Sequence, residues 1–228
     1  CTFGAGTLMK LYPVMVNMEG RLAVVIGGGG VAARKVADLL ESGARVKVVS
    51  PQINDEIMNL KENSVLELVK REYEYGDLEG AALVFSATND RSVNELVFME
   101  AEGLNIFINA VDDPDNCSFY VPSFTRKGDF LFALSTAGAA PAYAARIRRE
   151  LEKQIPEEID ILLDKLRRAR EILKNEKVVR ENLFSILDQL LPSSSEIDFH
   201  FSVFSMNEFN NDRYYRLIKS EVERLRPN

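Results

Sequence analysis

The sequence predicts an α/β fold, in which a doubly wound parallel sheet is followed by a small α+β region and a helical C-terminal region. Three observations support this prediction. Between residues 21 and 109, runs of β-branched and apolar residues alternate with amphipathic stretches, as in βαβ units. A run of four glycines directly follows the first apolar run. From Pro141 onward, apolar residues recur with helical spacing.

We expect five strands, each a short run rich in Val, Ile, Leu or Phe and bounded by turn residues. They are Leu22–Ile26, Arg45–Val49, Val65–Val69, Ala82–Ser86 and Asn105–Asn109. Amphipathic stretches separate them and predict helices at Val31–Ser42, Asn54–Glu62 and Arg91–Glu102. This alternation favours a parallel sheet with helices on its faces.

The pattern changes after Asp112, where short β-like runs are separated by Pro122 and by Lys127-Gly128. These runs are Ser118–Val121, Ser123–Thr125 and Asp129–Ser135. Helices are then expected at Ala142–Gln154, Glu157–Leu173 and Val178–Leu191. We therefore divide the chain into residues 9–112, 113–141, 142–192 and 193–228. The last segment has no clear sequence signature.

The composition excludes several classes of protein. A chain of 228 residues that is 46% hydrophobic can fill a core, which argues against disorder. Its 28 Lys and Arg against 35 Asp and Glu give a net charge of −7, so we expect neither nucleic acid nor an anionic membrane as a partner. The longest nearly apolar run, Leu22–Ala33, is shorter than the roughly 18 residues of a membrane span.

Cysteine and histidine are scarce. Cys1 and Cys117 cannot form a disulfide framework, and the single His200 cannot build a multi-histidine site, so we predict no metal site and a reducing, cytoplasmic setting. Cys1–Leu8 lacks the pattern of a signal peptide, and Met9 resembles a natural start.

The glycine-rich turn is the strongest functional signal. Gly27, Gly28, Gly29 and Gly30 follow an expected strand and open an expected helix, and Ala32 completes the Gly-x-Gly-x-x-Ala spacing of Rossmann-like dinucleotide-binding domains. The first glycine permits a tight turn, and the next lets the backbone approach a pyrophosphate at the helix N-terminus. A glycine turn that binds nothing is the alternative.

Polar residues at the ends of other strands extend the expected site. The second strand ends at Ser50, Pro51 and Gln52, without the acidic residue that NAD sites usually carry about 20 positions after the glycines. Ser50 can still hydrogen-bond a ribose hydroxyl, and the lack of a basic partner for a 2′-phosphate favours NAD over NADP. Thr88 and Asn89 follow the fourth strand and either line the nicotinamide half or cap the next helix.

The fifth strand ends at Asn109, which we add to the cofactor site, and an acidic cluster containing Asp112 follows. A carboxylate there suits acid/base chemistry, because the ligand crevice opens at the carboxyl ends of the strands. A solvated acidic turn is the alternative. Cys117 has no histidine near it in the sequence, and we expect it to be packed rather than nucleophilic.

A loop of small residues precedes the next helix and contains Thr136 and Gly138. The helix carries Arg146 and Arg149, in a stretch from Ala142 to Arg180 with 11 basic and 8 acidic residues. Such a loop and its arginines could receive the carboxylates of a ligand. Salt bridges on a helical surface are the alternative.

Several motifs together resemble precorrin-2 dehydrogenase, the dehydrogenase and ferrochelatase part of siroheme synthases. The resemblance covers roughly Met9 to Leu173. The motifs are Leu11–Val14, Val25–Gly29 with Ala33–Lys35, Val49–Pro51, Ala87–Asp90, Asn109–Asp112, Ser118–Ser123 and Ser135–Pro141.

The resemblance implies a homodimeric enzyme that oxidises precorrin-2 to sirohydrochlorin with NAD, built from a Rossmann domain, a central dimerisation region and a helical C-terminal region. The family's key aspartate falls on Asp112 and its loop serine on Thr136. Its cofactor contacts fall near Gly30, Val31, Pro51 and Gln52. We expect Asp112 to act as general base or to position the substrate. We assign the substrate's carboxylates to Thr136, Gly138, Arg146 and Arg149.

Other functions remain open at this stage. The same enzyme could also insert Fe²⁺ as a ferrochelatase. A non-catalytic NAD-sensing domain shares the glycine turn, but such domains favour an acidic residue after the second strand, and this reading leaves residues 122–141 unexplained. A dehydrogenase for an unrelated small acid would be expected to place a catalytic His or Lys at the crevice.

Overall fold

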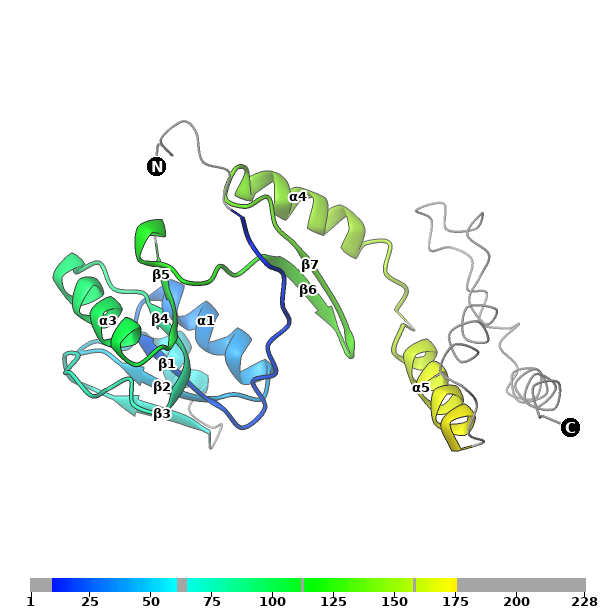
Figure 1. Ribbon diagram of the computed structural model, residues 1–228, viewed down its shortest axis with the longest axis horizontal. Coiled ribbons are helices and arrows are strands. Elements are labelled where there is room, and N and C mark those ends of the chain that lie inside the picture. Colours follow the sequence, from blue (N-terminus) through cyan, green and yellow to red (C-terminus); the bar gives the residue numbers. More distant parts are fainter. Residues whose placement is uncertain (1–9, 61–64, 112, 158, 176–228) are drawn as a thin grey trace, which may run out of the picture. The chain divides into compact units, whose positions relative to one another are not determined.

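The computed structural model describes residues 10–60, 65–111, 113–157 and 159–175 (Figure 1). The chain separates into two compact units. One unit is Tyr12–Val121, and the other combines Cys1–Leu11 with Pro122–Asn228. The expected cofactor residues all fall in the first unit, and the expected substrate residues of the 135–149 region fall in the second.

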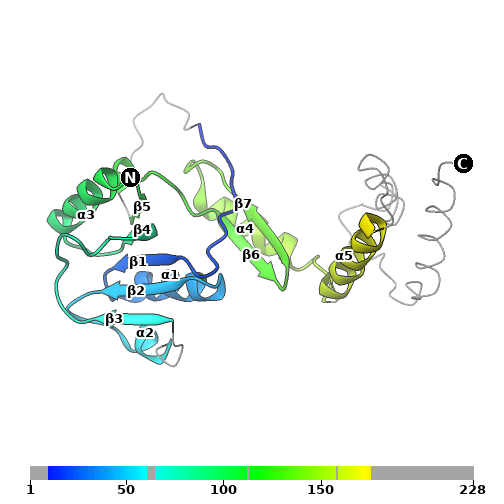
Figure 2. The same ribbon diagram turned by 60° about the horizontal axis from the view of Figure 1, so that its bottom comes forward.

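A five-stranded parallel sheet forms the centre of the first unit. Its strands are β1 (Leu22–Ile26), β2 (Arg45–Val49), β3 (Leu66–Val69), β4 (Ala81–Ser86) and β5 (Phe107–Ala110). Their order is β3-β2-β1-β4-β5, and all neighbouring pairs are parallel (Figure 2). The chain runs outward from β1 through β2 to β3 and then returns to β4 on the other side of β1. A ligand crevice is expected at this reversal, outside the carboxyl ends of the strands.

Helices cover both faces of this sheet, as the predicted doubly wound fold requires (Figure 1). The helices are α1 (Gly30–Glu41), α2 (Asp55–Asn59) and α3 (Arg91–Gly103), with a short 3₁₀ helix at Pro114–Asn116. Val25 and Val46 face a core shared with Val36 of α1. Val24 faces the opposite core, shared with Val97 of α3. Alternate residues of the strands thus enter different cores, and burial on both faces explains why the central strands are apolar.

The predicted bounds of β1 and β2 are the same as those in the structure. The fifth strand was expected two residues too early. Asn105 adopts a left-handed conformation with φ of 54°, and its N–H donates to the carbonyl of Glu102 in the turn that ends α3. The strand therefore begins only at Phe107.

The predicted strand at Ser118–Val121 is wrong. The N–H groups of Ser118 and Phe119 both donate to the carbonyl of Ile108 at 2.9 and 3.4 Å, and the Ser118 hydroxyl accepts from the N–H of Ile108 at 2.8 Å. These side-chain and bifurcated bonds replace a regular ladder. The segment instead packs on the core, where Phe119 meets Phe85 edge to face with ring centroids 5.3 Å apart.

The second unit contains the antiparallel strands β6 (Ser123–Lys127) and β7 (Phe130–Leu134), followed by α4 (Pro141–Glu152) and α5 (Ile159–Asn175). Helix α4 packs on both strands, and α5 contacts β7. The Thr125 hydroxyl donates to Glu152 at 2.7 Å, which ties β6 to the end of α4. The two β-like runs and two helices expected here are confirmed. The third expected helix, Val178–Leu191, and the segment 193–228 lie outside the described residues.

Over the described ranges, no helix has the length and apolar character of a membrane span.

Candidate functional site: a cavity at the glycine-rich turn

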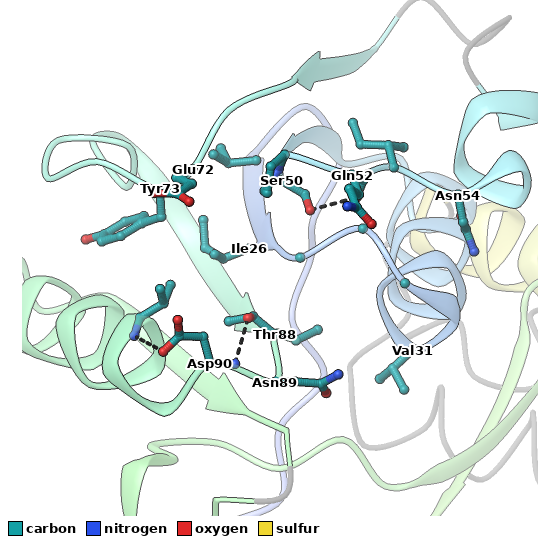
Figure 3. A pocket seen from close by; sticks show the side chains of 18 of the residues that line it. Ile26, Val31, Ser50, Gln52, Asn54, Glu72, Tyr73, Thr88, Asn89 and Asp90 are labelled. Atoms are coloured by element: carbon teal, nitrogen blue, oxygen red, sulfur yellow. Dashed lines mark hydrogen bonds between the residues drawn. The ribbon is translucent and has the colours of Figure 1, made fainter.

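A cavity of about 830 Å³ opens at the carboxyl ends of β1, β2 and β4 (Figure 3). Its walls come from the glycine turn, from the segments that follow β2, β3 and β4, and from the start of α3. The structure brings ten of the eleven expected cofactor residues to this cavity: Gly27, Gly28, Gly29, Gly30, Val31, Ser50, Pro51, Gln52, Thr88 and Asn89. These residues were chosen from separate stretches of sequence, and the parallel sheet gathers them at one edge.

Two glycines of the turn are required by its close packing. Gly27 has a φ of 119°, and a Cβ there would lie 2.4 Å from the carbonyl oxygen of Ala87. A Cβ on Gly28 would lie 1.9 Å from the carbonyl oxygen of Gln52. The Gly27 N–H donates to Val49 at 2.9 Å, and the Gly28 carbonyl accepts from Asn54 at 2.9 Å. The turn is therefore fixed against the segments that follow β2 and β4.

The other two glycines leave space open. A Cβ at Gly29 or at Gly30 would meet no atom of the described residues within 4 Å. Gly29 is the N-cap of α1 and has no side chain to accept the free N–H groups of the first turn, which also contains no acidic residue. The positive end of α1 thus faces the cavity with no carboxylate in its own first turn. Free N–H groups beside an unfilled backbone surface fit the pyrophosphate of a dinucleotide.

The segment after β2 is held by its own hydrogen bonds. The buried Ser50 hydroxyl donates to the carbonyl of Gln52 at 2.7 Å (Figure 3). Only the lone pairs of this hydroxyl remain for a ribose, so Ser50 can accept a hydrogen bond from a ligand but its proton is committed. Asn54 accepts from the N–H of Ile57 at 3.0 Å and caps α2.

The cap of α3 is Asp90, and neither of the expected candidates, Thr88 and Asn89, caps this helix. The Asp90 carboxylate accepts from the N–H of Ser92 at 2.9 Å and from its hydroxyl at 2.6 Å. These hydrogen bonds lower the pKa of Asp90. The Thr88 hydroxyl accepts from the N–H of Asp90 at 3.0 Å and shapes the turn. Asn89 remains exposed at the cavity.

One expected cofactor residue lies elsewhere, and the expected base is not among the described residues. The Asn109 amide donates to the carbonyl of Phe119 at 3.0 Å and is absent from the described lining of the cavity. It fastens the chain after β5 to that strand. Asp112, the expected base, lies outside the described residues. The N–H of its neighbour Val111 donates to the carbonyl of Ser86, the last residue of β4, at 2.8 Å.

Sequence reasoning missed the wall that follows β3, where Glu72 and Tyr73 line the cavity (Figure 3). The Tyr73 hydroxyl donates to the buried carboxylate of Glu100 in α3. Burial, together with this hydrogen bond, raises the pKa of Tyr73 above its ordinary value. The acidic residue sought after β2 is absent there, but one stands at the end of the neighbouring strand. Nothing in the sequence after β3 marks Glu72 as part of the site, because its neighbour Tyr73 is anchored by Glu100, which lies in α3.

The same loop is anchored by Asp77, whose side chain is 3% exposed. Arg71 donates to both carboxylate oxygens, at 2.7 and 2.8 Å, and Lys47 donates at 2.8 Å. The hydrogen bonds from Arg71, aided by those from Lys47, hold the pKa of Asp77 well below its usual range. The loop after β3 is thus fixed on both sides of Glu72.

Cys117 is packed, as expected. Its sulfur accepts from the N–H of Ala110 and donates to the carbonyls of Ala110 and Asp113, each at 3.2 Å. Burial raises the pKa of this thiol, which disfavours the nucleophilic thiolate.

In the second unit, a hydrogen bond within the loop of small residues before α4 holds that loop together. The Thr136 hydroxyl accepts from the N–H of Ala140 at 3.1 Å, and Gly138 has a φ of 82°. Arg146 and Arg149 are exposed on α4. Arg148, between them in sequence, pairs with Glu152 at 2.5 Å, as expected for a helical surface salt bridge. Within the described ranges, no group of three His, Cys, Asp or Glu side chains could hold a metal ion, and His200 lies outside those ranges.

Comparison with known proteins agrees with this geometry. Residues 14–123 match a family model of NAD(P)-binding domains, and residues 133–154 match the model of the central region of sirohaem biosynthesis proteins. The first match confirms the predicted dinucleotide-binding domain, and the second covers α4 and the loop that precedes it.

The curated relatives include siroheme synthases. That of Photorhabdus laumondii is 39% identical over 166 residues, or 73% of this chain and 35% of the relative. That of Pseudomonas paraeruginosa is 39% identical over 183 residues, which cover 77% of this chain and 39% of the relative. That of Neisseria meningitidis is 36% identical over 167 residues, which cover 73% of this chain and 35% of the relative. The chain thus spans little more than a third of the length of these relatives.

A solved structure described as SirC, precorrin-2 dehydrogenase, superimposes with a TM-score of 0.69 at 24% identity, over 90% of this chain and 100% of that one. This match confirms the Rossmann-like fold. The sequence matches confirm the predicted resemblance: the chain is related to the siroheme synthases through an NAD(P)-binding domain and the central region that follows it.

Proposed function

We propose that this protein is an NAD-dependent oxidoreductase that dehydrogenates precorrin-2 to sirohydrochlorin in siroheme biosynthesis. The observation that carries the proposal is the cavity at the uncapped N-terminus of α1, walled by the glycine turn and the carboxyl ends of β1, β2 and β4. The relatives named siroheme synthase and the structural likeness to a precorrin-2 dehydrogenase support the choice of reaction.

The cofactor fits the cavity in two respects. The N–H groups at the start of α1 would hold the pyrophosphate beside Gly29 and Gly30, where no Cβ intrudes. The cavity volume of about 830 Å³ lies within the range of ligand pockets. When bound, NAD⁺ supplies the acceptor for the hydride that leaves precorrin-2. The second hydrogen leaves as a proton, so the products are sirohydrochlorin, NADH and H⁺.

Asp112 is our candidate for the group that receives this proton or positions the substrate. In the sequence it follows the last residue of β5 by two positions, and the ligand crevice of a doubly wound sheet opens at the edge where the carboxyl ends of the strands lie. A carboxylate at that edge can accept a proton while the nicotinamide accepts the hydride. The remaining cofactor contacts proposed from the sequence that line the cavity are Val31, Ser50, Pro51, Gln52, Thr88 and Asn89.

For the substrate we propose the second unit. Precorrin-2 carries many carboxylates, and Arg146 and Arg149 are exposed on α4. Thr136 and Gly138 shape the loop that leads into this helix. Charge-assisted hydrogen bonds from exposed arginines suit such a ligand.

We further propose that the protein acts as a homodimer. Strands β6 and β7 form a two-stranded sheet, and a sheet of that size has an edge on either side that pairing with another chain would cover. The side chains of β7, Phe130–Leu134, are apolar and only half-buried. Sedimentation of the full chain at dilute concentration tests this, and a monomer would contradict it.

The enzymatic proposal is tested with Asp112→Asn and Asp112→Ala, assayed anaerobically with precorrin-2 and NAD⁺. The wild-type chain is expected to form NADH and sirohydrochlorin, and both variants to lose at least about a hundredfold in kcat, the scale of a lost general base. Full turnover by both variants would remove Asp112 from the mechanism. NADH binding without any turnover of precorrin-2 by the wild type would favour an NAD-sensing domain instead.

A further inference from the structure

We infer that Glu72 selects the dinucleotide: its carboxylate accepts a hydrogen bond from the ribose of the adenosine half and repels the 2′-phosphate of NADP. The assignment rests on the proposed binding of a dinucleotide to the cavity. It adds a specificity-determining residue that lies outside the strand end where such a group is usually sought.

The position of Glu72 places it on the adenosine side. In a doubly wound sheet with the pyrophosphate at α1, the ribose of adenosine lies toward the end of β2. Strand β3 is the neighbour of β2 on the side away from β1 and β4. The N–H of Ser50, directly after β2, donates to the carbonyl of Val69, the last residue of β3. Glu72 follows Val69 by three residues and lines the same cavity as Ser50 (Figure 3).

The electrostatic character of the cavity supports the same assignment. None of the described residues that line it is Lys, Arg or His, and its two carboxylates are those of Glu72 and Asp90. Asp90 is committed to capping α3. The Glu72 side chain is exposed, and within the described ranges no hydrogen bond or ion pair engages its carboxylate. The cavity therefore offers an acceptor for ribose hydroxyls and no cation for a 2′-phosphate.

The backbone around Glu72 is fixed before any ligand arrives. On one side, Arg71 makes two hydrogen bonds to the buried Asp77 and donates to the carbonyl of Glu72 itself at 2.8 Å. On the other side, Tyr73 donates to the buried Glu100. The backbone of such a loop loses little conformational freedom when Glu72 accepts a hydrogen bond.

Ser50 cannot take over this role. Its hydroxyl proton is used by the carbonyl of Gln52, and it carries no charge to oppose a phosphate. Discrimination by charge is therefore expected to fall on Glu72, while Ser50 contributes an acceptor to either dinucleotide.

The test is isothermal titration calorimetry of the full chain with NAD⁺ and, separately, with NADP⁺, in wild type and in Glu72→Gln. The substitution keeps the size of the side chain and removes its charge. We expect the Kd for NAD⁺ to rise about tenfold, as for the loss of a charge-assisted hydrogen bond, and the Kd for NADP⁺ to fall at least about threefold. Glu67→Gln is the matched control, because Glu67 is an exposed carboxylate of β3 outside the cavity lining, and neither Kd is expected to change.

Two outcomes would overturn the assignment while leaving dinucleotide binding intact. In one, Glu72→Gln leaves both dissociation constants unchanged. In the other, it weakens NAD⁺ and NADP⁺ equally, which would place Glu72 against a part that the two molecules share. Wild-type protein that binds neither dinucleotide would refute the proposed function itself, and the assignment with it. An unchanged thermal unfolding midpoint for Glu72→Gln confirms that the comparison is made between folded proteins.

Discussion

The phenolic hydroxyl of Tyr73 donates a hydrogen bond to the carboxylate of Glu100, which joins the loop after β3 to helix α3. Glu100 is 1% exposed and also accepts from the N–H groups of Gly76 and Leu78, at 3.1 and 3.2 Å. One buried carboxylate thus satisfies donors along the whole loop. The cavity wall formed by Glu72 and Tyr73 depends on a residue that does not itself line the described cavity.

Removing this acceptor is expected to destabilise the protein. Glu100→Ala leaves the Tyr73 hydroxyl, the buried N–H of Leu78 and the half-buried N–H of Gly76 without this acceptor, and we expect the free energy of unfolding to fall by about 3 kcal/mol. Glu100→Gln keeps one carbonyl oxygen and should lose less. Urea denaturation measures both. Glu102→Gln, at an exposed position of the same helix, should change the free energy by less than about 0.5 kcal/mol. Equal effects at both positions would contradict the structural role of Glu100.

Asp77 should make stability depend on pH in the acid range. Its folded pKa is depressed by Arg71 and Lys47, below the unfolded value of about 3.9. Its contribution is therefore fully present above the unfolded pKa and is lost as the pH falls through the folded pKa. Asp77→Asn should lower the free energy of unfolding at pH 7 by about 3 kcal/mol, because two cations lose their buried partner. The variant's unfolding midpoint in urea should also fall less steeply than the wild type's as the pH drops below 4.

A variant of the exposed Glu79 in the same loop, Glu79→Gln, serves as the control for Asp77. It should follow the acid dependence of the wild type. The interpretation fails if Asp77→Asn keeps the full acid dependence.

Two alanine substitutions in the glycine turn distinguish an effect on folding from an effect on dinucleotide binding. A Cβ at Gly28 would clash with the carbonyl of Gln52, so Gly28→Ala should lower the free energy of unfolding by at least about 2 kcal/mol. A Cβ at Gly29 meets no atom within 4 Å in the described part of the chain and enters the space assigned to the pyrophosphate. Gly29→Ala should keep the stability of the wild type to within about 1 kcal/mol and weaken NADH binding at least about tenfold. Tight NADH binding by a stable Gly29→Ala variant would show that the phosphates lie elsewhere.

Cys117 should be a slow nucleophile. Burial raises its pKa, and its thiol proton is held by backbone carbonyls. In native protein at neutral pH, we expect iodoacetamide to alkylate Cys117 at least about tenfold more slowly than in chain unfolded by urea. Mass spectrometry of the peptide that contains Cys117 measures both rates and separates it from Cys1. Equal rates would argue for a reactive thiol.

The sequence was informative about the sheet because the central strands are buried on both faces. Val24 and Val25 enter different cores, so each position had to be apolar, and the bounds of β1 could be read directly. The segment Ser118–Val121 has the same apolar character and is not a strand, because the Ser118 hydroxyl takes the N–H of Ile108 that a ladder would use. Side-chain hydrogen bonds of this kind leave no periodic trace in the sequence.

The candidate site, like the fold, could be predicted from the sequence only in part. The glycines could be placed because the turn has a fixed spacing and directly follows a strand. Glu72 could not be placed, because nothing in the stretch after β3 indicates that Arg71 and Tyr73 are anchored to Asp77 and Glu100. Glu100, the partner of Tyr73, lies in α3 and is distant along the chain. Only the fold shows that the loop after β3 forms a wall of the cavity.

The most direct test of the central claim is the stoichiometry of the reaction under anaerobic conditions. Precorrin-2 is supplied to the full chain with excess NAD⁺, and sirohydrochlorin and NADH are measured by their separate absorbance. We predict equal amounts of NADH and sirohydrochlorin, with neither formed when NAD⁺ is omitted. Sirohydrochlorin formed at the same rate without NAD⁺, or its absence after prolonged incubation of folded protein that binds NADH, would contradict the account.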